Sequence, residues 1–141
     1  CSRYATRLAT AGKSVGLGPL EMVELVESRA ANAAARKDDE AQRLIKATAA
    51  ATLRIALDEH GETLSSQSLA RLLGKHASQG AKLCAFLVGG PDGHGEEVLA
   101  AANLKLSLGT LTFPHGLARA LLIEQLYRAT TILAGHPYHR N

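Results

Sequence analysis

The chain has 141 residues, of which 46% are apolar and only 4% aromatic, which predicts a single domain over residues 1–141 with an aliphatic core of helices packed on a sheet. Its apolar runs all break before the roughly 20 residues that a membrane span needs, so we expect a soluble protein with no membrane partner. The formal charge of +3 permits an anionic partner, and two cysteines, Cys1 and Cys84, speak against a disulfide framework and favour the cytoplasm.

The first part of the chain is typical of alternating helices and strands. Residues 1–11 resemble the end of a helix, and the alternating side chains of residues 20–28 indicate a strand. Residues 29–37 are small and polar, which predicts a mobile connection. The acids at 38–40 complement the dipole of a helix N-terminus, so we expect a helix from there to about residue 50.

The middle of the chain continues this alternation. Residues 52–58 indicate a strand, and Ser65 or Ser66 fits the cap of a helix that runs to about Ser78. Residues 81–88 are almost all apolar, as expected for a central strand that is covered on both faces.

The last third predicts a helix at about 96–103, a short strand at 105–108 and a long final helix. Pro114 suits the opening turn of that helix, and Gly135 suits its end near Ala134. This alternation of strands and helices is typical of a mostly parallel α/β sheet with helices on both faces.

Two glycines follow the apolar run at 81–88 directly, within the sequence GGPDG. Gly89, Gly90 and Gly93 would let a ligand approach the backbone, and open α/β sheets bind ligands at the carboxyl ends of their strands. The spacing lacks the G-x-G-x-x-G pattern of dinucleotide-binding proteins. The alternative is an ordinary Pro-Asp-Gly turn in which Asp92 is structural.

A second segment with the composition of a binding loop is GTLTFPHG at 109–116. Its small and apolar side chains leave the main-chain N–H and C=O groups available, which suits recognition of an adenine edge better than catalysis. The alternative is a plain connection from a strand to a helix.

The C-terminal tail, HPYHRN, concentrates side chains that suit RNA. Tyr138, His136 and His139 can stack on an unpaired base, and Arg140 can bind a phosphate. The His-x-x-His spacing also occurs in metal sites, but no cysteine and no third ligand is near in the sequence, so we expect no metal. The alternative is a frayed terminus without a role.

The charge of the C-terminal third is one-sided. From Val98 onward the sequence has a single acid, Glu124, against four basic residues, Lys105, Arg119, Arg128 and Arg140. This end of the chain is therefore electropositive and suits a phosphate backbone. Arg128 lies four residues after Glu124, which is the favourable order for a surface ion pair on a helix.

The final helix also carries a broad apolar face, which serves either the core or a dimer contact. Its members are Leu117, Leu121, Leu122, Leu126 and Leu133.

Four segments in this order, GGPDG, LTFPHGLAR, EQLYRA and HPYHR, resemble the ribosomal large-subunit pseudouridine N3-methyltransferases, a single-domain branch of the SPOUT class. The resemblance implies a fold in which the C-terminal helix passes through a loop to form a trefoil knot, which is a rare exception among proteins. It also implies S-adenosylmethionine (AdoMet) as cofactor.

Matching the family residue by residue implies a cofactor site in three loops. Its expected residues are Leu57, Gly89, Gly90, Gly93, Gly109, Thr110, Leu111, Thr112, Phe113, Pro114 and His115. The same match gives four candidates for orienting or deprotonating the target base, namely His136, Tyr138, His139 and Arg140.

The resemblance further implies a homodimer whose active site lies between the subunits, and an acceptor in ribosomal RNA of the assembled ribosome. Family members begin with a strand and part of a helix that would precede Cys1, so we expect these residues in the full-length protein. Residues 29–37 lack the basic, glycine-rich character of the family, which argues against an RNA contact there.

Two other functions fit parts of the sequence. One is a non-catalytic ribosome- or RNA-binding protein that keeps the knotted fold, which predicts RNA binding without AdoMet binding. The other is a flavodoxin-like nucleotide-binding protein, which has no knot and no role for HPYHRN. The two intact loops favour the methyltransferase over both.

Overall fold

A computed structural model of the chain describes residues 28–79, 83–89, 93–109, 111, 113–135 and 138–139. The helix expected at 1–11 and nearly all of the strand expected at 20–28 lie outside these ranges. The chain divides into two compact units. We call Val23–Thr63 with Lys82–His115 the sheet unit, and Cys1–Met22, Leu64–Ala81 and Gly116–Asn141 the helical unit. A single domain over the whole chain stays a prediction.

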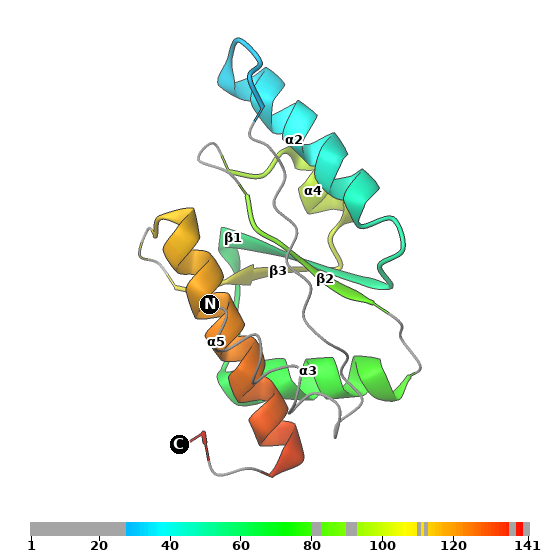
Figure 1. Cartoon of the computed structure of the whole chain (residues 1–141), viewed down its shortest axis with the longest axis vertical. Coiled ribbons are helices and arrows are strands. Elements are labelled where there is room, and N and C mark those ends of the chain that lie inside the picture. The colour runs from blue at the N-terminus through cyan, green and yellow to red at the C-terminus, as the bar shows by residue number, and fades with distance from the viewer. Residues whose placement is uncertain are drawn as a thin grey trace. The chain divides into compact units, whose positions relative to one another are not determined.

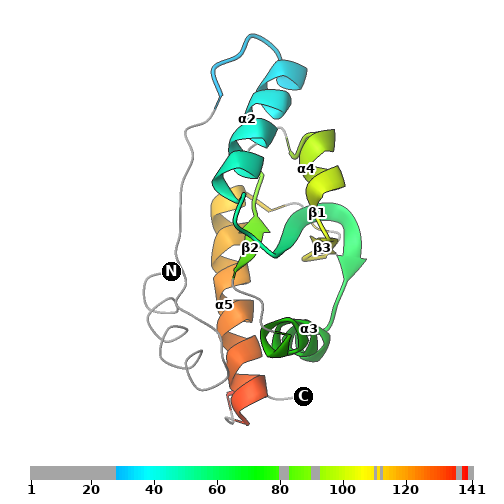
Figure 2. The ribbon, with the colours of Figure 1, turned by 90° about the vertical axis from the view of Figure 1, so that its right-hand side faces the viewer.

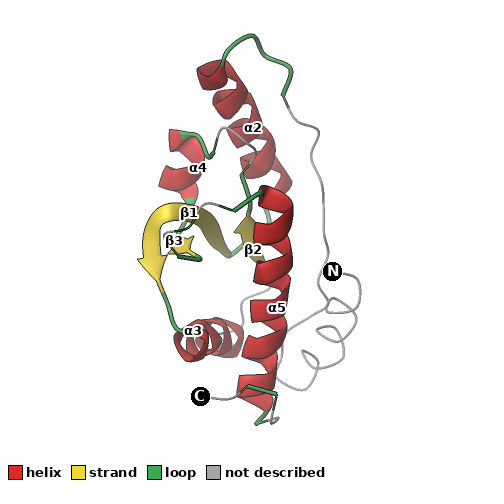
Figure 3. Cartoon of the chain, turned by 90° about the vertical axis from the view of Figure 1, so that its left-hand side faces the viewer, coloured by secondary structure: helices red, strands yellow, loops and turns green. Residues whose placement is uncertain are grey.

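The sheet unit contains a parallel sheet of three strands in the order β2-β1-β3 (Figure 1). These strands are β1 (Leu53–Thr63), β2 (Cys84–Leu87) and β3 (Leu104–Ser107). Figure 3 shows β1 as the long curved strand beside the two short ones. The expected parallel α/β architecture is thereby confirmed, while the knot and the helices on both faces stay predictions.

The register brings three strands to the same level at one edge of the sheet. Ala56 pairs with Leu87 of β2, and Leu57 pairs with Leu106 of β3. Beyond Leu57 the ladder with β3 shifts, because Leu106 also pairs with Glu62. The residues between Leu57 and Glu62 therefore form an irregularity within β1, which we call the β1 excursion, and β1 continues past the end at residue 58 that the sequence predicts.

Helices α2 (Ala33–Ala47) and α4 (Glu96–Ala101) lie side by side in the sheet unit (Figures 1 and 2). The buried core there joins α2, β1, β2 and α4 through Ala41, Ala56, Leu87 and Val98. Two of these positions are alanines, Ala41 of α2 and Ala56 of β1, and their small side chains allow the helices and the strand to approach closely.

The start of α2 corrects two predictions, the mobile connection at 29–37 and the helix start at the acids 38–40. The helix begins at Ala33 after the N-cap Asn32, whose side chain accepts a hydrogen bond from Ala35 N at 2.8 Å. Its first turn contains no acid, so Asp38 and its neighbours lie further along the helix and do not complement its N-terminus. An asparagine side chain accepts a hydrogen bond from a free N–H at a helix start, so Asn32 marks the residue after which α2 begins.

The helical unit contains α3 (Ser66–Ser78) and most of α5 (His115–Ala134). Ser65 caps α3 by accepting a hydrogen bond from Ser68 N at 3.0 Å, as one of the two alternatives predicts. Helix α5 begins directly after Pro114 and ends at Ala134, before Gly135 with φ of +72°. Both ends are as predicted, because proline and glycine act through local backbone geometry.

The other boundaries differ from the sequence-based ones by a few residues. Strand β2 is shorter than 81–88, of which residues 81 and 82 lie outside the described ranges, and α4 ends at Ala101. Among the described strands β1 is central and β2 lies at an edge, so the expected central position of the run at 81–88 is not found there. Within the described part of the chain, no helix combines the length and apolar character that crossing a membrane requires.

Candidate functional site

The β1 excursion and the loops after β2 and β3 lie at the same edge of the sheet. The strand register sets Leu57, the end of β2 at Leu87 and the end of β3 near Leu106 at one level. Residues 88–95 and 108–114 follow the ends of β2 and β3, and residues 58–61 belong to the β1 excursion, within the strand. Because carboxyl ends of parallel strands form the usual ligand site of open α/β sheets, this edge is the candidate cofactor site.

The loop after β2 turns back sharply at its glycines. A Cβ atom at Gly89 would lie 3.2 Å from the carbonyl carbon of Gly93 and 3.3 Å from His94 Nδ1. Gly93 has a φ of +81°, a conformation that favours glycine. Gly90, Pro91 and Asp92 lie outside the described residues, so the expected Pro-Asp-Gly turn stays a prediction.

His94 connects this loop to the end of β2. Its Nε2 donates a hydrogen bond to the carbonyl oxygen of Leu87 at 3.0 Å. Burial lowers the pKa of His94 from its ordinary 6.5, while the bond to Leu87 and the charge of Asp58 act in the opposite direction. Nδ1 is buried and has no hydrogen-bond partner among the described residues. The neutral ring therefore anchors the loop.

The loop after β3 is anchored by Ser107, which is 6% exposed. Its hydroxyl lies 2.9 Å from the carbonyl oxygen of Gly109 and 3.3 Å from that of Glu59, and it accepts a hydrogen bond from Gly109 N at 3.1 Å. One side chain thus ties the loop after β3 to the β1 excursion. Gly109 has a φ of +131°, which a residue with a side chain rarely adopts.

The composition of this edge fits AdoMet. No described atom lies within 4 Å of the position that a Cβ would take at Gly93 or Gly109, so both glycines present open backbone. Leu111 is 72% exposed, and Phe113 is half-buried nearby in the sequence. Bare backbone beside apolar side chains can hold an adenine ring.

Not every expected cofactor residue can be placed. Leu57, Gly89, Gly93, Gly109, Leu111, Phe113 and Pro114 belong to the loops after β2 and β3 or to the start of the β1 excursion. Gly90, Thr110, Thr112 and the side chain of His115 lie outside the described residues.

The expected RNA-facing tail is described at Tyr138 and His139, while His136 and Arg140 lie outside the described residues. Both described residues contact α5 within the helical unit. Tyr138 donates a hydrogen bond to Glu124 Oε1 at 3.1 Å, and His139 Nδ1 lies 3.1 Å from Nη1 of Arg128. The tail is therefore attached to α5 at these two residues.

The ion pair of Glu124 and Arg128 forms as the sequence predicts, but it is not a surface pair. Arg128 Nη2 and Nε donate to Glu124 Oε1 at 2.6 and 3.0 Å. The two side chains are only 25% and 18% exposed, for Arg128 and Glu124 respectively. Tyr138 and His139 of the tail also contact this ion pair, which helix spacing alone does not predict.

Sequence reasoning assigned no role to Ser107, His94 or Glu124 beyond the surface pair. His94 had a visible signal, because it follows GGPDG directly. Ser107 had none, since its partners lie in the backbone of another strand. Glu124 lies within EQLYRA, one of the matched segments, but its link to Tyr138 spans 14 residues.

Two other features of the sheet unit offer no competing site. An open cavity of about 370 Å³ is lined by His60, Gly61, Glu62 and residues 102–105. It shares His60 and Gly61 with the β1 excursion but contains none of the expected cofactor residues, and its charged groups have mixed signs, so we prefer the loops at the sheet edge. Burial raises the pKa of the free Cys84 thiol to about 12, so it is no nucleophile at neutral pH.

Metal ligands do not gather among the described residues, where no group of at least three His, Cys, Asp or Glu side chains could hold an ion. His136, one half of the His-x-x-His pair, is outside that search.

Comparison with known proteins identifies a family that the chain matches over nearly its whole length. A family model described as a predicted SPOUT methyltransferase matches residues 1–139 of the chain. The match includes every loop that forms the sheet edge and the described part of the tail.

Many relatives carry the name ribosomal RNA large subunit methyltransferase H, and three of them illustrate the similarity. The protein of Rhizobium meliloti strain 1021 is 50% identical over 138 residues, which cover 98% of this chain and 86% of the relative. Those of Sinorhizobium fredii and Rhizobium johnstonii are 50% and 47% identical over 139 residues, 99% of this chain and 87% of each relative. The chain therefore belongs to the SPOUT methyltransferase family, whose members use a methyl donor.

Proposed function

We propose that this protein transfers a methyl group from AdoMet to N3 of a pseudouridine in large-subunit ribosomal RNA. The observation that carries the proposal is the register of the sheet, which aligns the β1 excursion with the ends of β2 and β3, each followed by a glycine-containing loop. Membership of the SPOUT family and the names of the relatives support the reaction and its RNA substrate.

The proposed cofactor residues follow from the sequence match and the shape of the edge. Leu57, the glycines of GGPDG and the segment from Gly109 to His115 would hold AdoMet, with main-chain groups facing the adenine. When bound, AdoMet supplies a methyl group that its sulfonium activates. The protein then has to align donor and acceptor, which is the task of rigid loop anchors such as Ser107 and His94.

The proposed base-binding residues are His136, Tyr138, His139 and Arg140. In the proposed homodimer, the tail of one subunit reaches the cofactor loops of the second. Exposed leucines support a dimer, because Leu117 and Leu121 lie one turn apart on α5 and are 48% and 36% exposed. The assembled ribosome as substrate would place the reaction in the cytoplasm, and a preformed RNA surface would supply specificity to a small single domain.

The test combines binding and turnover in one preparation. Calorimetric titration with AdoMet measures binding, and transfer of a labelled methyl group to ribosomes that lack the modification measures activity. Binding together with transfer supports the proposal. Binding alone means a different acceptor, and RNA association without AdoMet binding by the folded full-length protein means the non-catalytic alternative.

Two substitutions separate the proposed roles. Gly90→Trp should abolish AdoMet binding, because an indole would occupy the space beside the backbone. Arg140→Ala should leave AdoMet binding intact and lose methyl transfer. Full activity of Arg140→Ala on ribosomes would show that the tail does not serve the reaction.

A further inference from the structure

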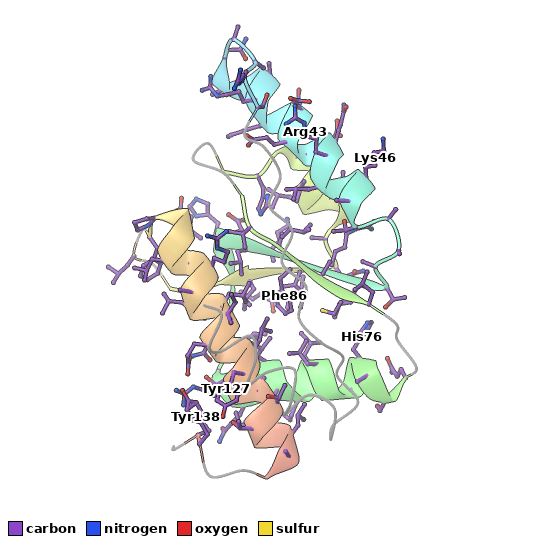
Figure 4. All side chains as sticks on the ribbon, in the orientation of Figure 1. Arg43, Lys46, His76, Phe86, Tyr127 and Tyr138 are labelled. Atoms are coloured by element: carbon purple, nitrogen blue, oxygen red, sulfur yellow. The ribbon has the colours of Figure 1, made fainter. Side chains whose placement is uncertain are left out.

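Four side chains of the helical unit form one connected cluster, which we call the tail clamp: Glu124 and Arg128 of α5 with Tyr138 and His139 of the tail. Glu124 Oε1 accepts hydrogen bonds from Arg128 and from the hydroxyl of Tyr138. Arg128 also lies over the ring of Tyr138, with its guanidinium carbon 4.9 Å from the ring centroid. Figure 4 shows Tyr138 beside Tyr127 near the C-terminal half of α5.

The tail clamp combines aromatic packing with an ion pair. The rings of Tyr127 and Tyr138 meet edge to face, with centroids 4.8 Å apart and an interplanar angle of 60°. Such pairs prefer this geometry, and a cation over an aromatic ring adds attraction. Glu124 and Arg128 balance each other's charge, so the clamp can be largely buried without an isolated charge.

The contact with Arg128 favours one of the two neutral forms of the His139 ring. A guanidinium has only donors, so the contact of 3.1 Å between Arg128 Nη1 and His139 Nδ1 requires Nδ1 to accept. A neutral imidazole with an accepting Nδ1 carries its proton on Nε2. The clamp therefore favours the form of His139 in which Nε2–H is a donor.

We propose that Glu124 and Arg128 are positioning residues that present His139 to the target base as an Nε2–H hydrogen-bond donor, and that His139 does not remove the N3 proton. This inference rests on the proposed function. A donor suits a uracil-type ring, because loss of the N3 proton leaves negative charge on the neighbouring carbonyl oxygens. A preoriented donor stabilises that charge.

Methyl transfer to N3 does not require His139 to act as a base. The N3 proton passes to water, and the electron pair that it leaves on N3 forms the new bond to the methyl carbon. The bond from that carbon to sulfur breaks at the same time, and its electron pair stays on the sulfur. His139 keeps its proton throughout.

The protonation of His139 is measured directly on the full-length protein without RNA or cofactor. Long-range ¹H–¹⁵N correlation spectra of ¹⁵N-histidine protein distinguish the two neutral forms of each ring, and His139→Gln identifies the signals among those of six histidines. We expect His139 in the Nε2–H form, and a shift toward a mixture in Arg128→Leu. An Nδ1–H ring in the unmodified protein overturns the proposal, and so does a spectrum that Arg128→Leu leaves unchanged.

Two substitutions of His139 test its role in turnover. The amide of glutamine can place an N–H donor where Nε2 lies, whereas asparagine reaches only the position of Nδ1. We expect His139→Gln to keep methyl transfer within about 10-fold and His139→Asn to lose about 10²-fold, the usual cost of removing a donor that stabilises developing charge. AdoMet affinity should stay unchanged in both. Equal losses in the two variants would mean that donation from Nε2 is not the role.

The outcomes also separate this inference from the proposed function. If the unmodified protein binds AdoMet but methylates no ribosomes, the acceptor proposed above is wrong. The spectra still decide whether Arg128 selects the Nε2–H form. If methyl transfer occurs and the spectra show the Nδ1–H form, the proposed function is supported and the proposed role of the tail clamp is wrong.

Discussion

Arg128 donates two hydrogen bonds to the same oxygen of Glu124, from Nη2 at 2.6 Å and from Nε at 3.0 Å. The same carboxylate oxygen accepts from Tyr138, and the same guanidinium contacts His139. An ion pair one helical turn apart thus holds a tail that is more than ten residues away in the sequence. We expect this arrangement to matter for turnover more than for stability.

Arg128→Leu should lower methyl transfer by about 10²-fold, because misplacement of a reacting group by about 1 Å has this effect. AdoMet affinity should stay unchanged. Single-turnover kinetics with ribosomes and calorimetry with AdoMet make the two measurements.

Arg43→Leu is the matched control for Arg128→Leu. Arg43 also forms an ion pair with the acid four residues before it, Asp39, at 2.8 Å, with 40% and 41% of the two side chains exposed. Its loss should cost about 0.3–0.5 kcal/mol of stability and leave turnover unchanged. Similar losses of activity in both variants would point to a general effect of charge on RNA binding.

Gly109→Ala should weaken AdoMet binding by distorting the loop after β3. The φ of +131° at Gly109 is unfavourable for alanine, at a cost of about 1–3 kcal/mol. Gly116→Ala is the control, since no described atom beyond its chain neighbours and its own helix backbone lies within 4 Å of the new Cβ, and alanine in a helix gains about 0.5–1 kcal/mol. Calorimetry with AdoMet measures the affinity of each variant. If Gly109→Ala binds AdoMet as tightly as the unmodified protein, the loop after β3 is not part of the cofactor site.

Gly61→Ala should destabilise the sheet unit. A Cβ at Gly61 would lie 2.5 Å from the carbonyl oxygen of Lys105, a backbone atom that cannot turn away. Overpacking of this kind costs about 1–3 kcal/mol. Urea denaturation measures the loss. An unchanged midpoint would mean that the excursion between Leu57 and Glu62 is not held against β3.

His94 should make the stability of the protein depend on pH. Its pKa in the folded protein lies below the ordinary 6.5, because burial disfavours the charged ring. The unfolded chain therefore binds the proton first as the pH falls, and the contribution of neutral His94 is complete above 6.5 and lost as the pH falls through the folded pKa.

His94→Gln supplies the comparison for this pH dependence. Glutamine keeps an N–H donor for the carbonyl of Leu87 but does not titrate. The free energy of unfolding should fall more between about pH 8 and about pH 5 in the unmodified protein than in the variant, because position 94 titrates only in the unmodified protein. Parallel curves would show that protonation of His94 is not coupled to folding.

Cys84 should resist alkylation in the folded protein. Burial raises its pKa to about 12, so almost no thiolate is present at neutral pH. Iodoacetamide should label Cys84 of a Cys1→Ser variant only after denaturation, as mass spectrometry can show. Rapid labelling of the native protein would contradict the burial and reopen a covalent mechanism.

The sequence by itself determined the class of fold and most element types. The apolar run before Gly89, the cap Ser65 and the Pro114 and Gly135 limits of α5 are local signals, since each acts on its own turn of backbone. The prediction of a mobile connection at 29–37 was wrong, because the N-cap Asn32 starts α2 at Ala33, ahead of the acids at 38–40. The order of GGPDG, LTFPHGLAR and HPYHR was enough to identify the family.

Tertiary structure alone decided which side chains act together. The register aligns Leu57 with Leu106, Ser107 joins the loop of Gly109 to Glu59, and α5 brings Glu124 to Tyr138. Each of these contacts links residues whose spacing follows no helical or strand period. Their hydrogen bonds form only after the strands have paired and the tail has folded back, so no local pattern in the sequence records them.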